Sequence, residues 1–578
     1  MTIAGAQADT SRTTVFRNGK ILTLDGSAQA TEALIIHSGR VVASGAVADV
    51  QHRIGPQAEF VDLHGATLLP GLIDTHPHLL HFGAFSYPLV DIADASSHAD
   101  IVSRIRVRAN ETPPGEWILT TPVGEPHYFI RRSYRDLAEK ELPQRQVLDH
   151  ATTDHPVMIQ AWAPVTPNVC AFNSAALARL DITRDIPDRV DNVWIAKDAA
   201  GEPTGILRGS VNNYYNNCPF WDRLLLHIPL LQPAAVLPGA RQAMPAYNAM
   251  GVTTVYEGHL MGARDIESYR TLRNENALTL RVLIALEAEP YGLAWTKPLS
   301  MAAFHAHLNR ALASRDLSDD LLRVNGVTFT RGGSCWPGFL RMRQPYQGPY
   351  GEATTGVSFV SAEKAQIAVE FCAERGLRLN IIAVGDQEHD EYLEQLEAIA
   401  ACHDIRSQHW ILQHAFFVEP EHARRYAALG FDVTTSMSFC WGKGDLFIER
   451  VGESVLQHLL PLRRLLDAGL TVACGTDWGP KNVFEHLELA MTHRFGKSGR
   501  TNRGPAQMVT REEALAMWTR DAARVLGWEG IGTLTPGNHA DLIIVDRDPL
   551  SCPLDDLPKT RVLRTVLGGK TVYDAGVL

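Results

Sequence analysis

The middle of the chain alternates between strand-like and helix-like segments, and this rhythm constrains the fold more than any other feature. Short apolar runs rich in β-branched residues are separated by longer amphipathic segments such as "SAEKAQIAVEFCAERG" and "DEYLEQLEAIAACH". Strand followed by helix, repeated, is typical of a parallel sheet covered by helices. The strand-like runs are residues 67–74, "VTTVYE", "LRVLIALE", "LLRVNGVTFT", "LRLNIIAV", "HWILQHAFF", "FDVTTSMSF" and "LTVACGTD". Eight such units predict a TIM (β/α)8 barrel, an α/β fold.

The two ends of the chain resemble each other and differ from the middle. Both contain short β-rich runs joined by glycine turns, such as "TVFRNGKILTLD" near the start and "RVLRTVLGGKTVYDAG" near the end. This texture predicts a small β-sandwich domain built from residues 12–68 and 535–578 together. The barrel then occupies residues 69–534. Residues 95–235 break the strand–helix rhythm, and we expect them to form an insertion over the barrel mouth.

The composition is that of an ordinary globular enzyme and excludes several other classes. The formal net charge is −11 and no long basic run occurs, so neither nucleic acid nor a membrane surface is an expected partner. The start lacks the apolar core of a signal peptide, and no apolar stretch approaches a membrane span. The eight cysteines form no CxxC pair, which favours a reduced cytoplasmic protein. We expect a small-molecule substrate. The sequence does not decide whether the protein is a monomer or a homo-oligomer.

Several predicted strands end in residues that can bind metal, at the barrel edge where TIM-barrel chemistry takes place. His76 and His78 follow the first strand, and their spacing places both imidazoles on one face. His414 interrupts the apolar run "WILQHAFF", and Asp477 follows the last strand. Each alone has a structural explanation, as a satisfied buried histidine or a helix-capping carboxylate. Together they predict a metal site, because imidazole is the commonest metal ligand near neutral pH.

The motifs of the chain resemble those of one large enzyme family along almost its whole length. They are "ATLLPGLIDTHPHL", "FNSAAL", "GEPTGILRG", "GVTTVYEGH", "AVGD", "TVACGTDW", "EEALAMWTRDAARVLG" and "IGTLTPGNHADLIIVDRDP". This set is similar to the amidohydrolase superfamily, and most similar to the family-3 amidohydrolases, which include the N-substituted formamide deformylases. The resemblance implies a metal-dependent hydrolase, although the superfamily as a whole hydrolyses many kinds of bond.

The chain departs from the family pattern at two metal-binding positions. The family has a lysine, often carboxylated, after the fourth strand, where this chain has Thr328. It has a histidine after the fifth strand, where this chain has Ile382. A hydroxyl is a poor ligand and an alkyl group is none, so we expect one divalent ion, Zn²⁺, rather than two. The remaining candidate ligands are His76, His78, His414 and Asp477, with Glu257 as a substitute from the neighbouring strand.

The expected chemistry is hydrolysis of a carbon–nitrogen bond of the amide type. A bound divalent ion lowers the pKa of water from roughly 16 to about 7. The resemblance implies that Asp477 accepts the proton and passes it to the leaving nitrogen. His414 binds the metal or polarises the substrate carbonyl. Arg331, Cys335 and Trp336 lie in the loop "TRGGSCWPGF" and are candidate substrate contacts, although a purely structural glycine-rich loop is the competing explanation.

Aromatic residues in and near the insertion bear on the size of the substrate. If they line a pocket, they favour a bulky or aromatic substrate, whereas most aromatic clusters simply form core. The residues are Trp162, Tyr214, Tyr215, Trp221, Trp336 and Phe339.

Two further functions stay open beside hydrolysis. The first keeps the metal as a Lewis acid and makes the protein a lyase, hydratase or isomerase, since two usual ligands are missing. The second is a non-catalytic relative that binds a ligand or a protein. The retained histidine pair and Asp477 argue against this second function. Metal content separates the last function from the others, and product analysis in ¹⁸O-labelled water separates the first two.

Overall fold

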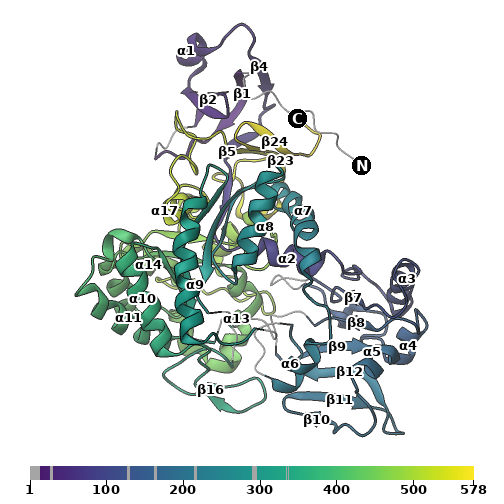
Figure 1. The fold of residues 1–578 in the computed structure, drawn as a ribbon. Helices are drawn as coiled ribbons and strands as arrows, with labels where there is room; N and C mark the ends of the chain where they lie inside the picture. Colours follow the sequence, from purple (N-terminus) through teal and green to yellow (C-terminus); the bar gives the residue numbers. More distant parts are fainter. Residues whose placement is uncertain are drawn as a thin grey trace.

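The centre of the molecule is a sheet of eight parallel strands with the order β21-β20-β19-β18-β15-β14-β13-β6 (Figure 1). The computed structural model describes residues 13–26, 30–125, 131–161, 166–213, 218–289, 296–333, 335 and 338–578. The strands are β6 (Leu72–Asp74), β13 (Val252–Glu257), β14 (Arg281–Glu287), β15 (Leu322–Thr330), β18 (Leu379–Ala383), β19 (Ile411–His414), β20 (Asp432–Thr435) and β21 (Val472–Cys474).

The two edge strands of this sheet, β6 and β21, meet and nearly close it into a barrel. The Thr75 amide donates to the Cys474 carbonyl (3.4 Å), and the Asp477 amide donates to the His76 carbonyl (2.8 Å). All residues of β13 and β14 are buried, because helices cover the outside and neighbouring side chains fill the inside. The prediction of a TIM barrel is confirmed.

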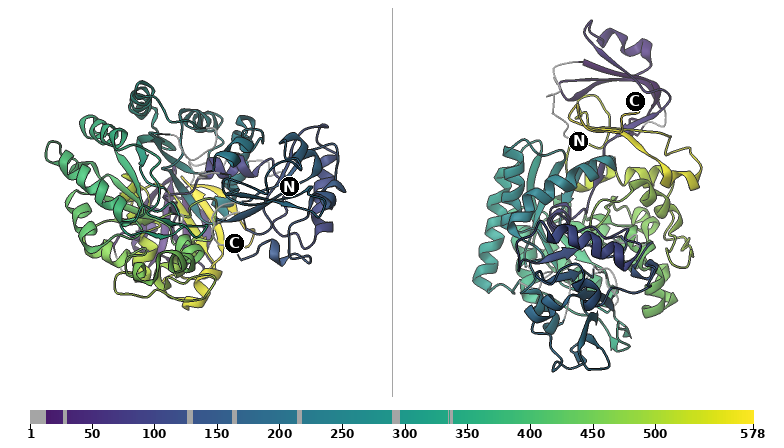
Figure 2. Two further views of the ribbon diagram at one scale, coloured as in Figure 1. Left: turned by 90° about the horizontal axis from the view of Figure 1, so that it is seen from below. Right: turned by 90° about the vertical axis from the view of Figure 1, so that its right-hand side faces the viewer.

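Helices connect the barrel strands and lie around them, as the view from below shows (Figure 2). Helix α10 illustrates how the sequence sets their ends. The Ser361 side chain accepts from the Lys364 amide at its start, and Gly376 ends it with a φ of 62°. The helices of the barrel are α2 (Leu79–Ser86), α7 (Pro233–Ala249), α8 (Ala263–Asn274), α9 (Met301–Ser314), α10 (Ala362–Arg375), α11 (Asp386–Ala400), α12 (Pro420–Ala428), α13 (Ser438–Val451), α14 (Leu462–Asp467), α15 (Val483–Thr492), α16 (Arg511–Ala516) and α17 (Arg520–Leu526).

A second eight-stranded sheet joins the two ends of the chain and lies at one end of the barrel (Figure 1). The antiparallel pair β5–β22 links its two halves, and β5 lies only one residue before the first barrel strand. The strands are β1 (Thr13–Ile21), β2 (Thr31–His37), β3 (Arg40–Gly45), β4 (Glu59–Asp62), β5 (Thr67–Pro70), β22 (Leu542–Val545), β23 (Val562–Leu567) and β24 (Lys570–Asp574). The domain boundaries given above stay a prediction.

The insertion contains a six-stranded sheet of its own, which lies beside the barrel in both figures. It contacts the barrel through Ser210, which hydrogen-bonds to Tyr350, and through an ion pair between Arg131 and Glu485 of α15. Its strands and helices are β7 (Ile118–Thr120), β8 (Val157–Ile159), β9 (Asn168–Phe172), β10 (Arg189–Val190), β11 (Val193–Lys197), β12 (Pro203–Gly209), α3 (His98–Ala109), α4 (Arg145–Asp149), α5 (Ser174–Arg179) and α6 (Pro219–Leu225). Within the described part of the chain, no helix combines the length and apolar character that crossing a membrane requires.

Candidate metal centre

The seam between the first and last barrel strands brings the histidine pair next to Asp477. Asp74 ends β6, and its buried carboxylate accepts from the Thr476 amide (2.9 Å), the Thr476 hydroxyl (2.6 Å) and the His76 amide (3.1 Å). These bonds tie the carboxyl ends of β6 and β21 together. The residues that follow each strand, His76 and His78 on one side and Asp477 on the other, therefore face the same space.

Three histidines and Asp477 form a compact buried cluster at this point. One ligand atom each of His76, His414 and Asp477 lies within 4.8 Å of the others. Nε2 of His78 is 3.5 Å from Oδ1 of Asp477, and Nε2 of His76 is 3.8 Å from Oδ2. The His76 ring centre is 4.6 Å from that of His78 and 5.1 Å from that of His414. Two imidazoles on one tetrahedral zinc ion, with Zn–N of about 2.0–2.1 Å, have ring centres about 5 Å apart. The spacing therefore fits a shared ion.

The backbone at this cluster is held in a conformation that non-glycine residues rarely adopt. The φ angles are 51° at His78, 68° at His414 and 55° at Asp477. Such left-handed residues cost of order 1–3 kcal/mol each and gather at functional sites, where the surrounding structure enforces them. The buried Lys481 ammonium donates to the carbonyls of Thr476 (2.8 Å) and Asp477, which holds the strained loop in place.

Burial keeps the cluster histidines neutral. It lowers the pKa of His76 and His78 well below the ordinary value and that of His414 to about 3, and the neighbouring histidines add to the effect. A neutral imidazole offers the lone pair that metal binding requires. Among the described residues, neither ring nitrogen of His76 has a hydrogen-bond partner, although the residue is only 2% exposed. Leaving a buried polar group unpaired is costly, so these residues fit a bound cation.

Thr328 and Ile382 occupy the two positions where the family has further metal ligands, and neither offers a ligand here. The Thr328 hydroxyl donates to the Gly258 carbonyl (2.5 Å), and Ile382 is an ordinary buried aliphatic residue. The Asn380 side-chain amide donates to the same Gly258 carbonyl (2.7 Å) and to Oε1 of Gln413 (2.5 Å). A neutral polar network thus fills this side of the barrel and supports the backbone after β13.

Glu257, the candidate substitute ligand, is engaged elsewhere. Its carboxylate accepts from the Leu80 amide (2.9 Å) and the Tyr269 hydroxyl (2.5 Å), which supports the start of α2 directly after His78. Burial raises the pKa of Glu257 to about 7. We therefore leave Glu257 out of the ligand set that we propose.

Two further residues, His259 and Lys443, lie beside the cluster. The His259 ring centre is 5.4 Å from that of His78, and its Nδ1 is 2.7 Å from Oε2 of Glu287. The Lys443 ammonium, on α13, is buried, and its charge helps to lower the pKa of His414 and opposes the rise in the pKa of Asp477. His259 and Glu287 lie at the ends of adjacent strands, a position that can be recognised in the sequence. Lys443 lies within a helix, where the sequence pattern does not indicate that a side chain reaches the cluster.

Comparison with known proteins places this geometry in a family. A family model described as "Amidohydrolase family" matches residues 59–573. The chain belongs to the amidohydrolase family. The predicted resemblance is confirmed, and the family identifies the protein as a hydrolase. The chain is 25% identical over 586 residues to the N-substituted formamide deformylase of Arthrobacter pascens, covering 96% of this chain and 97% of that protein.

Two solved structures share the fold of this amidohydrolase. An uncharacterised metal-dependent hydrolase from Pyrococcus furiosus superposes with a TM-score of 0.68 and 21% identity, covering 93% of this chain and 100% of that one. An adenosine deaminase from Xanthomonas campestris, solved with bound zinc, superposes with a TM-score of 0.54 and 15% identity, covering 97% and 93%.

The predicted substrate residues of this amidohydrolase have different surroundings. Arg331 pairs with Glu391, with 3.3 Å between Nη1 and Oε2, and so points toward α11. Sγ of Cys335 is 3.3 Å from Nζ of Lys443, which brings the loop of Cys335 to the cluster. Burial raises the pKa of the Cys335 thiol to about 11, which disfavours a nucleophilic thiolate. Trp336 lies outside the described residues.

The aromatic residues that could line a substrate pocket also differ in their surroundings. Trp221 is fully buried in the insertion, and its indole donates to the Asn212 carbonyl (2.7 Å), so it belongs to the core. Phe339 is partly buried, 6.2 Å from Phe359 between ring centres. The remaining aromatic candidates, Trp162, Tyr214, Tyr215 and Trp336, lie outside the described residues.

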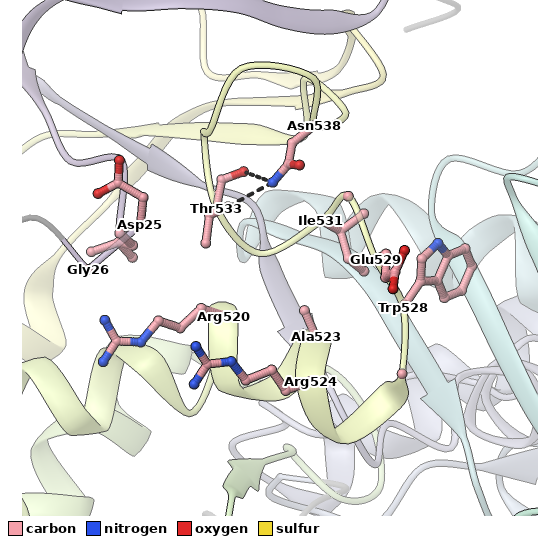
Figure 3. Close-up of a pocket in the computed structure, with 13 residues that line it drawn as sticks. Asp25, Gly26, Arg520, Ala523, Arg524, Trp528, Glu529, Ile531, Thr533 and Asn538 are labelled. Carbon is pink, nitrogen blue, oxygen red and sulfur yellow. Dashed lines mark hydrogen bonds between the residues drawn. The ribbon is translucent and has the colours of Figure 1, made fainter. Parts of the chain in front are cut away.

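A separate cavity of about 330 Å³ lies at the seam between α17 and the sheet of the chain ends (Figure 3). Arg520 and Arg524 lie side by side along it, and Asp25 stands across from them. Arg520 is partly exposed and Arg524 is exposed, and both lie close to Asp521. The cavity shares no residue with the histidine cluster, so the candidate centre is the one at the barrel seam.

Proposed function

We propose that this amidohydrolase cleaves an amide-type carbon–nitrogen bond of a small molecule and uses one zinc ion to do so. The observation that carries the proposal is the buried donor set of His76, His414 and Asp477, whose ligand atoms lie within 4.8 Å of one another. The similarity to an N-substituted formamide deformylase supports the bond type, and the zinc in a structural neighbour supports the metal. The free state of all eight cysteines supports a cytoplasmic location.

The ion is held, in this proposal, by His76, His78 and His414 together with Asp477. The neutral imidazoles are suited to this role because burial lowers their pKa values. When bound, a divalent ion supplies Lewis-acid polarisation and makes water a stronger acid. The absence of ligands at Thr328 and Ile382 leads us to expect a single ion rather than two.

Asp477 receives the proton that the attacking water loses. Burial raises its pKa to about 6, while the neighbouring Lys481 and Lys443 ammonium groups oppose that rise. At neutral pH the carboxylate is therefore mostly ionised yet close to the range in which a base works best. As the water oxygen bonds to the carbonyl carbon, Asp477 holds the proton. It then passes that proton to the leaving nitrogen, and a carboxylic acid and an amine form.

Lys443 stabilises the charge that develops on the carbonyl oxygen. Its ammonium is buried among Cys335, His414 and Asp477, and a positive charge acts strongly where water is excluded.

The test is product analysis in ¹⁸O-labelled water with a panel of N-substituted formamides and other small amides. Hydrolysis predicts one labelled oxygen in the released acid and an equivalent of free amine. An unlabelled product, or turnover without release of amine, would contradict hydrolysis and favour a lyase or isomerase. Binding of zinc with no turnover across the panel would speak for a non-catalytic relative.

A further inference from the structure

The ends of the second and third barrel strands, β13 and β14, carry a histidine–carboxylate pair beside the metal cluster. Nδ1 of His259 is 2.7 Å from Oε2 of Glu287, and the two residues are only 5% and 3% exposed. With a carboxylate as its acceptor, Nδ1 carries the proton, and Nε2 keeps the lone pair. Metal-binding histidines are commonly oriented in this way by a carboxylate on the far ring nitrogen.

The His259 ring lies next to the rings of His76 and His78. Its ring centre is 5.4 Å from that of His78 and 5.9 Å from that of His76. Two imidazoles on one ion have centres about 5–6 Å apart when the angle between their bonds is about 110–130°. The rings of His259, His76 and His78 therefore border the same interior space.

The backbone around His259 is fixed from both sides. On one side the Leu260 amide donates to Oε2 of Glu287 (3.0 Å), and Leu260 has a left-handed φ of 62°. On the other side the Gly258 carbonyl accepts from the Thr328 hydroxyl (2.5 Å) and the Asn380 amide (2.7 Å). Thr328, at the position of the missing family lysine, thus supports the residue that precedes His259.

We propose that His259 is a ligand of the metal centre, oriented by Glu287, and that it supplies the nitrogen lost at Ile382. The inference rests on the proposed zinc ion. It explains how a metal site can persist although two family ligands are absent, and Thr328, at one of the two replaced positions, supports the His259 segment instead. A further nitrogen ligand also leaves Asp477 free to act mainly as proton acceptor.

The experiment measures zinc affinity of the metal-depleted full-length protein by competition with a chromophoric chelator. It also counts imidazole ligands by X-ray absorption at the zinc edge. Glu287→Gln should weaken zinc binding by about 10–100-fold, the usual cost of losing an orienting partner. His259→Ala should weaken it more and remove one imidazole from the count. The control is His81→Gln, because His81 is equally buried but directs Nε2 toward Asp265 (3.7 Å), and it should bind zinc within threefold of wild type.

A second variant protects the test against misfolding. His259→Gln keeps a side-chain donor for Glu287, so it decides the matter if His259→Ala shows a lowered melting temperature. Zinc affinity and an imidazole count equal to wild type in both folded variants would overturn the proposal. Because these readouts do not need turnover, zinc binding without amide hydrolysis contradicts the proposed function alone and leaves the ligand test decisive.

Discussion

At the residue scale, the candidate centre depends on side chains that the backbone presents under strain. His78, His414 and Asp477 all have left-handed φ angles, and the carboxylate of Asp74 and the ammonium of Lys481 hold the loops that carry two of them. The enforced positions keep neutral imidazoles and a carboxylate close together before any ligand arrives. Preorganisation of this kind is what metal binding and electrostatic catalysis require.

Replacing Asp477 by asparagine separates proton transfer from metal binding. The amide still offers an oxygen but cannot accept a proton near pH 7, so turnover should fall by about 10² or more. Zinc content, measured by elemental analysis, should fall little, because the histidines carry most of the binding. Equal losses of zinc and turnover would make Asp477 a ligand alone, and turnover near wild type would remove it from the mechanism.

Replacing Lys443 by methionine removes a buried cation of similar length. We expect kcat to fall by about 10²-fold, the scale of losing one group that stabilises an oxyanion, with zinc content unchanged. The matched control is Lys497→Met, since Lys497 is exposed and should leave kcat unaltered. A fall in substrate affinity with normal kcat would instead assign Lys443 to ground-state binding.

At the scale of single elements, helix α11 anchors the loop that follows the fourth barrel strand. The Glu388 carboxylate, in the first turn of α11, accepts from the Gly332 amide (2.7 Å) and the Val384 amide (2.9 Å). The anchored loop continues to Cys335, which contacts Lys443. A buried carboxylate in a structural role therefore sits only one loop away from the candidate centre.

This anchor should make stability depend on pH. Burial raises the pKa of Glu388 from 4.5 to about 7, so the folded chain binds more protons than the unfolded chain between these values. Its contribution is fully present below pH 4.5 and is lost as pH rises through 7, by roughly 3 kcal/mol. In Glu388→Gln the melting temperature should change less across this window than in wild type. The exposed Glu394→Gln is the control, and parallel curves for wild type and Glu388→Gln would contradict the assignment.

The elements also show how far the sequence alone could lead. The eight barrel strands could be predicted from the sequence. So could the clustering of His76, His78, His414 and Asp477, because parallel strands bring their carboxyl ends to one edge. The orientation of a side chain past a strand end was not predictable. The sequence pattern therefore favours Glu257 as a candidate ligand, although its side chain faces the start of α2, and gives no reason to prefer His259, two residues later. Lys443 reaches the centre from a helix, where periodicity gives no such signal.

At the scale of the whole molecule, a buried ion pair joins the barrel to the sheet formed by the chain ends. Arg281 begins β14, and Asp541 directly precedes β22. Their side chains are 3% and 2% exposed and make two bonds, Nε to Oδ2 at 2.6 Å and Nη2 to Oδ1 at 3.0 Å. Asp541 also accepts from the Gly568 amide (2.7 Å), so this pair ties distant parts of the chain together.

Breaking the pair on one side should destabilise the molecule strongly. Arg281→Met leaves the Asp541 charge buried without its partner, which costs about 3–5 kcal/mol. Replacing both residues, as in Arg281→Met with Asp541→Asn, should recover part of that loss because no buried charge remains. Urea unfolding followed by far-UV circular dichroism measures the difference, and a single variant as stable as wild type would show that the pair contributes nothing.

The central claim is that one metal ion at the barrel seam gives this amidohydrolase its activity, and a zinc titration tests it most directly. Metal-depleted protein is titrated with Zn²⁺ while hydrolysis of an N-substituted formamide or another responsive amide is followed, with His76→Ala as the control that should bind no zinc tightly. The account predicts that activity rises linearly and reaches its plateau at about one zinc per chain. A plateau at two, or turnover in the fully metal-depleted protein, would contradict it.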